Sequence, residues 1–351
     1  MWTAPVRASI PHVPARFDWK EIDLSLVPSH LVAALGLLAL APLALGADAP
    51  KPGDRLERQG DEIMVCGQLF HTGTPIVLWT DPGGYDAYRV GPRFIPADKV
   101  SPDLPKVRYN TRANDLPKAD KDRIGAYGWD LASLQKVVDQ FVYHYDVCGT
   151  SKRCFRVLQD DRGLSVHFML DVDGTIYQTL DLKERAWHAT IANSRSVGIE
   201  IANMGAYPPG KTGPRDKWYE KDASGRVKIK LPTSPEEELI HNPQALLAPA
   251  RNEPVTGKIQ GQTLEQYDLT EAQYDALTKL TAALCTVFPK IKCDYPRDAS
   301  GEVRPNALSR PEFDKYQGVM GHWHVQANKP DPGPAFQWDK VVDGARALMK
   351  K

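Results

Sequence analysis

Two histidines directly follow short apolar runs, which predicts that their side chains lie at the edge of a sheet. His144 follows residues 141–143 (FVY), His322 follows residues 319–321 (VMG), and Asp331 lies in the next proline-rich segment. Two imidazoles and one carboxylate leave one tetrahedral position of a zinc ion open to water, as in catalytic zinc sites. Zinc lowers the pKa of bound water toward about 7 and supplies hydroxide at neutral pH. Spacing alone leaves open that these histidines are hydrogen-bonded core or surface residues.

An acidic residue interrupts the apolar run at residues 197–202 (VGIEIA). A carboxylate at Glu200 is costly there unless it is paired or transfers a proton, and it shares a strand face with the small residues Gly198 and Ala202. We therefore consider Glu200 a general base acting on zinc-bound water; the alternative is an edge-strand glutamate that faces solvent. Lys329 precedes Asp331 closely and could bring a cation to a developing oxyanion, unless it is a simple surface lysine.

The hydrophobic pattern predicts the elements that position these residues. Asp173 and Gly174 end the segment between two strand-like runs, a hairpin signal, and Thr270 with Gln273 forms a capping box. The pattern favours an α/β fold with a mixed central β-sheet flanked by helices. The predicted strands are residues 141–143, 166–170, 175–180 and 197–202, and the predicted helices are 151–159, 270–288 and 338–349.

The remaining segments predict one main domain with additions. Residues 126–351 form the expected catalytic domain, and residues 205–265, rich in proline, glycine and charge, are expected to be an insertion in it. Residues 50–125 are expected to wrap this domain as an amino-terminal extension. Within them, residues 63–70 and 75–80 are predicted as a strand-like pair.

Composition excludes several classes of protein. The chain has 351 residues, with 44 basic and 44 acidic side chains. A formal charge of zero argues against a nucleic-acid partner, which a basic surplus would indicate. Hydrophobic residues make up 42% and charged residues 25% of the chain, so it is neither wholly disordered nor a multi-span membrane protein. The five cysteines include no CxxC pair, which argues against a structural zinc finger.

Residues 31–46 form the most apolar run of the chain. The run is interrupted by Pro42 and is shorter than the roughly 20 residues that a spanning helix needs. Small residues at its end suit a signal-peptidase site, so residues 1–49 are predicted as a signal-peptide region. An uncleaved anchor or a buried helix remains the alternative, because about 30 residues precede the run. Export would bring the chain to the periplasm, cell envelope or extracellular space, where cysteines can pair, without a stable membrane span.

Several ordered motifs carry a family resemblance between residues 138 and 345, outside the expected insertion. Together they resemble the zinc-dependent N-acetylmuramoyl-L-alanine amidases, the type-2 amidases, which are related to phage-lysozyme amidases and to peptidoglycan recognition proteins. Such an ordered set is more specific than any one motif. The motifs are residues 166–168 (VHF), 173–178 (DGTIYQ), 186–189 (AWHA), 193–201 (NSRSVGIEI), 321–322 (GH) and 329–338 (KPDPGPAFQW).

The resemblance implies a fold, a metal and a reaction. It implies a mixed sheet with flanking helices, Zn²⁺ bound by His144, His322 and Asp331, Glu200 as catalytic acid and base, and Lys329 as an aid to the transition state. The implied reaction is hydrolysis of the amide between N-acetylmuramic acid and L-alanine, in peptidoglycan or in muropeptides. A non-catalytic recognition module that only binds peptidoglycan is the alternative, although the acidic third ligand favours activity.

Other positions near the implied groove remain open. The interval from His322 to Asp331 is one residue shorter than the usual family pattern, so His324 is a rival ligand. His167 and His188 match recurring family positions and are expected to support the ligands or contact substrate; packing of His188 beside Trp187 is equally compatible with its position. Trp187 and Asn193 are further substrate-binding candidates.

The cysteines are the last prediction drawn from the resemblance. Recognition proteins carry a bonded pair similar to Cys148 and Cys154, so these two are disulfide candidates in an exported chain. Cys285 and Cys293 are a second candidate pair, which leaves Cys66 free. All five are reduced if the chain is not exported.

Overall fold

The computed structural model describes residues 58–350, except 113–115, 212–214 and 232–239. The predicted signal region, residues 1–49, lies outside the described residues. None of the helices in the described part of the chain is long and apolar enough to cross a bilayer.

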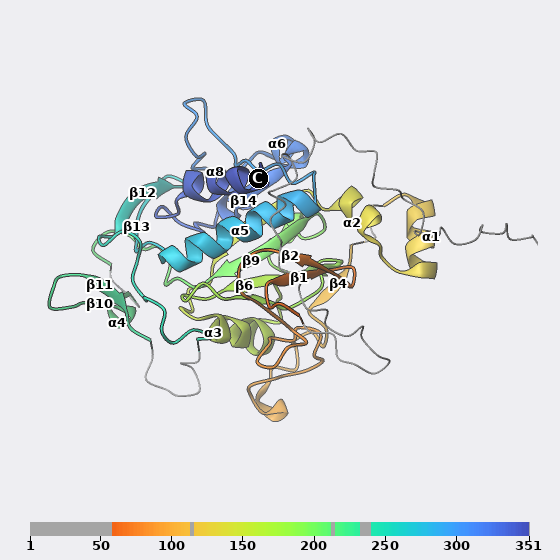
Figure 1. The fold of residues 1–351 in the computed structure, drawn as a ribbon, viewed down its shortest axis with the longest axis horizontal. Coiled ribbons are helices and arrows are strands. Elements are labelled where there is room, and N and C mark those ends of the chain that lie inside the picture. The colour runs from red at the N-terminus through yellow and green to blue at the C-terminus, as the bar shows by residue number, and fades with distance from the viewer. Residues whose placement is uncertain (1–57, 113–115, 212–214, 232–239, 351) are drawn as a thin grey trace, which may run out of the picture. The chain divides into compact units, whose positions relative to one another are not determined.

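A six-stranded mixed sheet forms the centre of the fold (Figure 1). Neighbouring strands are parallel except for one antiparallel pair, β6 with β7. The predicted mixed α/β architecture is confirmed. In spatial order the strands are β14 (Gly318–Gly321), β5 (Gln140–Tyr145), β9 (Ser196–Ile201), β6 (Phe168–Leu170), β7 (Ile176–Gln178) and β3 (Ile76–Leu78).

The strands follow from the apolar runs that predicted them. β5, β9 and β14 are almost continuously buried, as expected for strands covered on both faces. The antiparallel pair β6–β7 is closed by a turn in which the Gly174 N–H donates to the Asp171 carbonyl oxygen at 3.0 Å. Gly174 has φ +87°, a conformation that glycine adopts without a Cβ clash. The predicted hairpin is confirmed.

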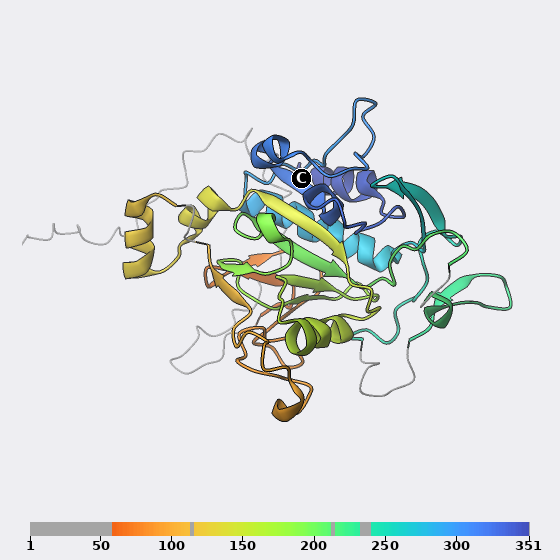
Figure 2. The same cartoon turned by 180° about the vertical axis from the view of Figure 1, so that it is seen from behind.

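Helices cover both faces of the sheet (Figures 1 and 2). On one face lie α5 (Glu271–Val287) and α8 (Trp338–Met349), which pack against each other. Phe168 and Leu170 of β6 join the core cluster on that side, whereas Met169, between them, joins the cluster of the opposite face with residues of α3 (Ser151–Arg156). Because side chains alternate along a strand, each face has its own core.

The helix predictions hold closely. The capping box of α5 is present: Thr270 Oγ1 accepts from the Gln273 N–H at 3.0 Å, and Gln273 Oε1 accepts from the Thr270 N–H at 3.0 Å. The helix predicted from residue 151 continues beyond α3 as a π-helical turn. The remaining helices and turns are α1 (Lys118–Tyr127), α2 (Leu131–Val137), α6 (Arg310–Lys315), α7 (His322–Val325), the π turn (Val157–Arg162) and the 3-10 turns (Ala97–Lys99 and Thr190–Ala192).

One strand prediction is wrong. Residues 63–70 do not pair with residues 75–80; they fold into their own hairpin of β1 (Glu62–Val65) and β2 (Gln68–His71). The reason lies in Cys66 and Gly67, whose φ values of 51° and 73° fit a type I′ turn. The second run instead supplies β3, which lies parallel to β7 in the central sheet.

The segment before residue 126 shares the core of the sheet. Ile63, Val65, Ile76 and Leu78 belong to the same buried cluster as β5 and β9. This segment therefore completes the main core as well as lying around it, and its boundary as a domain remains a prediction. Further along the segment, β4 (Tyr109–Thr111) pairs antiparallel with β8 (Glu184–Ala186).

The expected insertion contains two hairpins in its described part. Ile259 and Leu264, from the second hairpin, are buried in the main core cluster. Gln266 Oε1 accepts from the Ala335 N–H at 3.0 Å, and Gln266 Nε2 donates to the Pro332 carbonyl oxygen at 3.0 Å, so the hairpin holds the loop that carries Asp331. The elements are α4 (Arg215–Trp218), β10 (Tyr219–Lys221), β11 (Val227–Ile229), β12 (Val255–Ile259) and β13 (Gln262–Gln266).

Candidate active site

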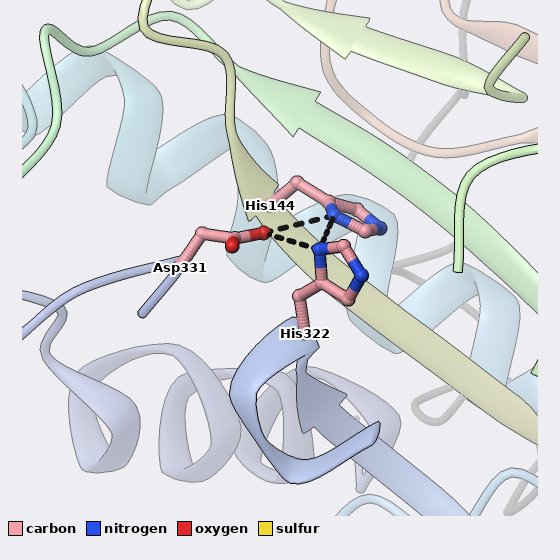
Figure 3. Close-up of side chains that lie close together, drawn as sticks. All are labelled: His144, His322 and Asp331. Carbon is pink, nitrogen blue, oxygen red and sulfur yellow. Dashed lines mark hydrogen bonds and ion pairs between the residues drawn. The ribbon is translucent and has the colours of Figure 1, made fainter. Parts of the chain in front are cut away.

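Two histidines and an aspartate converge at one end of the sheet (Figure 3). His144 lies near the carboxyl end of β5, and His322 begins α7 directly after β14, which is parallel to β5. The two Nδ1 atoms are 3.0 Å apart, and Asp331 Oδ2 lies 3.0 Å from that of His144 and 2.8 Å from that of His322. All three side chains are buried, with exposed fractions of 2%, 5% and 6%.

The hydrogen bonds of the two rings suit a cation between them. His322 Nε2 donates to Gln326 Oε1 at 2.8 Å, which leaves the Nδ1 lone pair directed at Asp331. Burial and the neighbouring His322 lower the pKa of His144 to about 4, so its ring is neutral near pH 7. Burial alone would raise the pKa of Asp331, but the two histidines hold it below the usual range. Two imidazole nitrogens and a carboxylate oxygen are a donor set that zinc accepts.

A glycine brings the loop of Asp331 close to β14. A Cβ at Gly321 would lie 2.6 Å from Pro332 Cδ, so only glycine fits without a shift. The Trp323 N–H donates to the Asp331 carbonyl oxygen at 3.1 Å. These contacts explain why glycine precedes His322 in the sequence.

His324 does not join the three converging residues. Its Nδ1 accepts from the Gly321 N–H at 2.9 Å, and its Nε2 donates to the Arg304 carbonyl oxygen at 2.8 Å. Burial lowers the pKa of His324 to about 3. Since both ring nitrogens bind backbone, the structure gives the rival ligand a structural role.

Glu200 and Lys329 line the same cavity as the three converging residues, a cavity of about 620 Å³. Glu200 of β9 is the direct register partner of His144 on β5, so the two side chains leave neighbouring strands on the same face. Burial, followed by the negative charge of Asp331, raises the pKa of Glu200 well above its usual range. The positive charge of Lys329 contributes to the low pKa of His144.

The substrate-binding candidates are divided by the structure. Trp187, His188 and Asn193 line the cavity, whereas His167 does not. His167 is fully buried, and its Nδ1 accepts from the Gly198 N–H at 3.1 Å. The expectation of substrate contact is therefore wrong for His167, because the sheet and its own hydrogen bonds enclose it. Asn193 Oδ1 accepts from the His188 N–H at 3.1 Å and so holds the cavity loop.

Two contributors to the site were not predicted. Gln326 fixes the ring of His322, and only its i, i+4 spacing from that histidine could have indicated this. Arg112, from the amino-terminal segment, is fully buried, and its guanidinium donates to backbone carbonyl oxygens of the loop between β8 and β9 and of its approaches. Burial lowers its pKa to about 9. Its acceptors are Leu182, Asn193, Ser194 and Ser196, at 2.8–3.2 Å.

The five cysteines are free thiols in the structure. Cys148 and Cys154 both line the cavity, and their sulfur atoms lie within 4.8 Å of each other and of an Asp146 carboxylate oxygen. The disulfides proposed for Cys148 with Cys154 and for Cys285 with Cys293 stay predictions.

The sheet and its site define an α/β protein with metal-ligand side chains gathered at the carboxyl ends of parallel strands. A family model described as N-acetylmuramoyl-L-alanine amidase (Amidase_2) matches residues 134–334. The match covers more than half of the chain and includes every residue of the converging group. The chain belongs to this amidase family, and the family resemblance noted in the sequence is confirmed.

Solved structures with a similar fold are also amidases by title. A selenomethionine derivative of AmpD is 17% identical, with a TM-score of 0.31, over 74% of this chain and 98% of that chain. AmiD from E. coli, solved with anhydro-N-acetylmuramic acid-L-Ala-D-γ-Glu-L-Lys, is 18% identical, with a TM-score of 0.31, over 59% of this chain and 57% of that chain. LysC from Clostridium intestinale URNW is 13% identical, with a TM-score of 0.30, over 61% and 88%. The chain matches none of the curated proteins.

Proposed function

We propose that this protein is a zinc-dependent hydrolase that cleaves the amide between the lactyl group of N-acetylmuramic acid and L-alanine. The observation that carries the proposal is the convergence of His144, His322 and Asp331 beside Glu200 in one cavity, in a member of the amidase family. Peptidoglycan or a muropeptide is the proposed substrate. The signal predicted at residues 1–49 makes the periplasm or cell envelope the proposed location.

The three converging side chains would hold the ion. Zinc, when bound, would acidify a water molecule and polarise the substrate carbonyl. Glu200, with its raised pKa, suits both uptake of a proton from the attacking water and its return to the departing amine of L-alanine. Lys329 would bring a positive charge to the oxyanion that develops on the carbonyl oxygen.

The test is product analysis of a defined muropeptide. The zinc-loaded protein is expected to release a peptide with a free L-alanine amino terminus and a sugar with a free lactyl carboxylate, both identified by mass spectrometry. Turnover is expected to stop with a chelator and to return with zinc. Binding of the muropeptide without turnover would favour a recognition module, and cleavage at another amide would reject the proposed substrate bond.

A further inference from the structure

His188 lies between the proposed metal ligand His144 and the central sheet. Its Nδ1 is 3.0 Å from His144 Nε2, and its Nε2 is 3.2 Å from Ser196 Oγ. We propose that His188 is a positioning residue, which fixes the tautomer and ring orientation of His144 so that Nδ1 is presented to zinc. This inference rests on the proposed function, because it concerns the same metal centre.

The direction of the hydrogen bonds follows from the position of the ion. His144 Nδ1 faces His322 Nδ1 and Asp331 Oδ2, so it must carry the lone pair if the three atoms share a cation. The ring proton of neutral His144 is then on Nε2 and is donated to His188 Nδ1. His188 in turn carries its proton on Nε2 and donates it to Ser196. The chain from serine to metal ligand therefore has one consistent polarity, of the kind by which groups behind metal ligands set the histidine tautomer.

The fold fixes the position of His188. Asn193 Oδ1 accepts from its backbone N–H, and its ring is at 85° to the ring of His144. The space for the ring exists because residue 198 of β9 is glycine. A Cβ at Gly198 would lie 2.5 Å from His188 Nδ1 and Cε1. This contact explains a glycine inside an otherwise apolar strand.

The same contacts argue against direct recognition of substrate by the imidazole. His188 lines the cavity, but both of its ring nitrogens are already engaged by His144 and Ser196. A substrate hydrogen bond to either nitrogen would break the chain that holds the metal ligand. His188 is therefore expected to affect metal binding before it affects substrate binding.

The first test measures the dissociation constant of zinc by competition with a chelator. His188→Ala is expected to weaken zinc binding by about 10- to 100-fold, the usual effect of losing the partner of a metal ligand. His188→Asn is the conservative variant, because its Oδ1 is as many bonds from Cα as the histidine Nδ1 and can accept from His144. It is expected to recover most of the affinity. Trp187→Phe is the matched control in the same loop and should bind zinc like the parent.

Two further measurements do not depend on replacing His188. Gly198→Ala touches none of the three proposed ligands, but it should displace the His188 ring and weaken zinc binding. In the zinc-free parent, nitrogen chemical shifts of the imidazoles should show His144 with its proton on Nε2, and this preference should be reduced in His188→Ala. Thermal unfolding of each zinc-free variant checks that it folds.

The outcomes separate this inference from the proposed function. If the parent binds zinc and cleaves the muropeptide, but His188→Ala binds zinc equally tightly, the positioning role is rejected. An unchanged zinc affinity with a raised KM would assign His188 to substrate contact instead. A parent that binds no zinc would overturn both proposals, whereas one that binds zinc without cleaving would overturn the proposed function alone.

Discussion

At the scale of single residues, the site depends on which atoms of each ring face the centre. His144 and His322 both direct Nδ1 inward, while their Nε2 atoms bind His188 and Gln326. Glu200 enters the same space from the neighbouring strand. Binding of the ion and proton transfer are thus assigned to different side chains, which allows them to be tested separately.

Glu200→Gln is expected to abolish most turnover while zinc remains bound. The amide has nearly the shape of the carboxylate but cannot take a proton from water, and a general acid–base residue contributes about 10²- to 10⁴-fold to the rate. The measurements are kcat on a muropeptide and zinc content of the purified variant. Equal activity of variant and parent would remove Glu200 from the mechanism, and loss of zinc would assign it to the metal site.

Two buried neutral histidines predict how stability depends on pH. The pKa is about 4 for His144 and about 3 for His324, against about 6.5 for histidine in an unfolded chain. Between these values the unfolded chain binds more protons, so the folded state loses stability as pH falls below about 6.5. Each group can contribute up to about 1.4 kcal/mol per pH unit. Urea unfolding of the zinc-free protein between pH 7 and 4.5 tests this, and a flat profile would contradict it.

At the scale of elements, the carboxyl ends of β14, β5 and β9 gather the site at one edge of the sheet. Because these strands are parallel, residues that follow each strand meet at that edge. On the opposite face, α5 and α8 provide the main core. The rigidity of this packing fixes the distance between the two histidines.

Thr270→Ala is expected to destabilise the protein through the start of α5. The hydroxyl caps the helix by accepting from Gln273, and it also donates to the buried Val172 carbonyl oxygen at 2.9 Å. Loss of a cap costs about 1 kcal/mol, and the second bond adds to this. The free energy of unfolding in urea measures the effect. Thr270→Ser keeps the hydroxyl and should stay close to the parent; an equal loss in both variants would contradict the capping role.

The sequence predicted these elements to the extent that their signals are local. Continuous apolar runs indicated β5, β9 and β14, and a capping box indicated the first turn of α5. The hairpin of β1 and β2 was missed because its turn depends on two positive φ values, one of them at a cysteine. The contact of His188 with His144 could not be predicted, because it depends on how a loop folds back over Gly198.

At the scale of the whole described chain, the amino-terminal segment supports the cavity loop from behind. Arg112 is fully buried and donates to four backbone carbonyl oxygens that frame the approach to β9. The sequence gave no indication of this, since arginine is rarely fully buried. Part of the segment before residue 126 is therefore needed for the shape of the site.

Arg112→Met is expected to lower both stability and zinc affinity. The carbonyl oxygens would lose their donor inside the protein, and each buried unsatisfied group costs about 1–3 kcal/mol. The loop that carries His188 would also lose its support. Urea unfolding and zinc competition are the measurements, with Arg89→Met as a control because that arginine binds the Pro92 carbonyl oxygen at the surface. Parent-like values for Arg112→Met would show that the loop holds itself.

The three proposed ligands come from positions 144, 322 and 331, and this spacing has a consequence for biosynthesis. A ribosome has to complete almost the entire polypeptide before the second and third ligands exist. A nascent chain therefore cannot acquire its ion early, and any chain released before residue 331 would lack the aspartate. Zinc uptake must come at the end of maturation, in whichever compartment the finished chain folds.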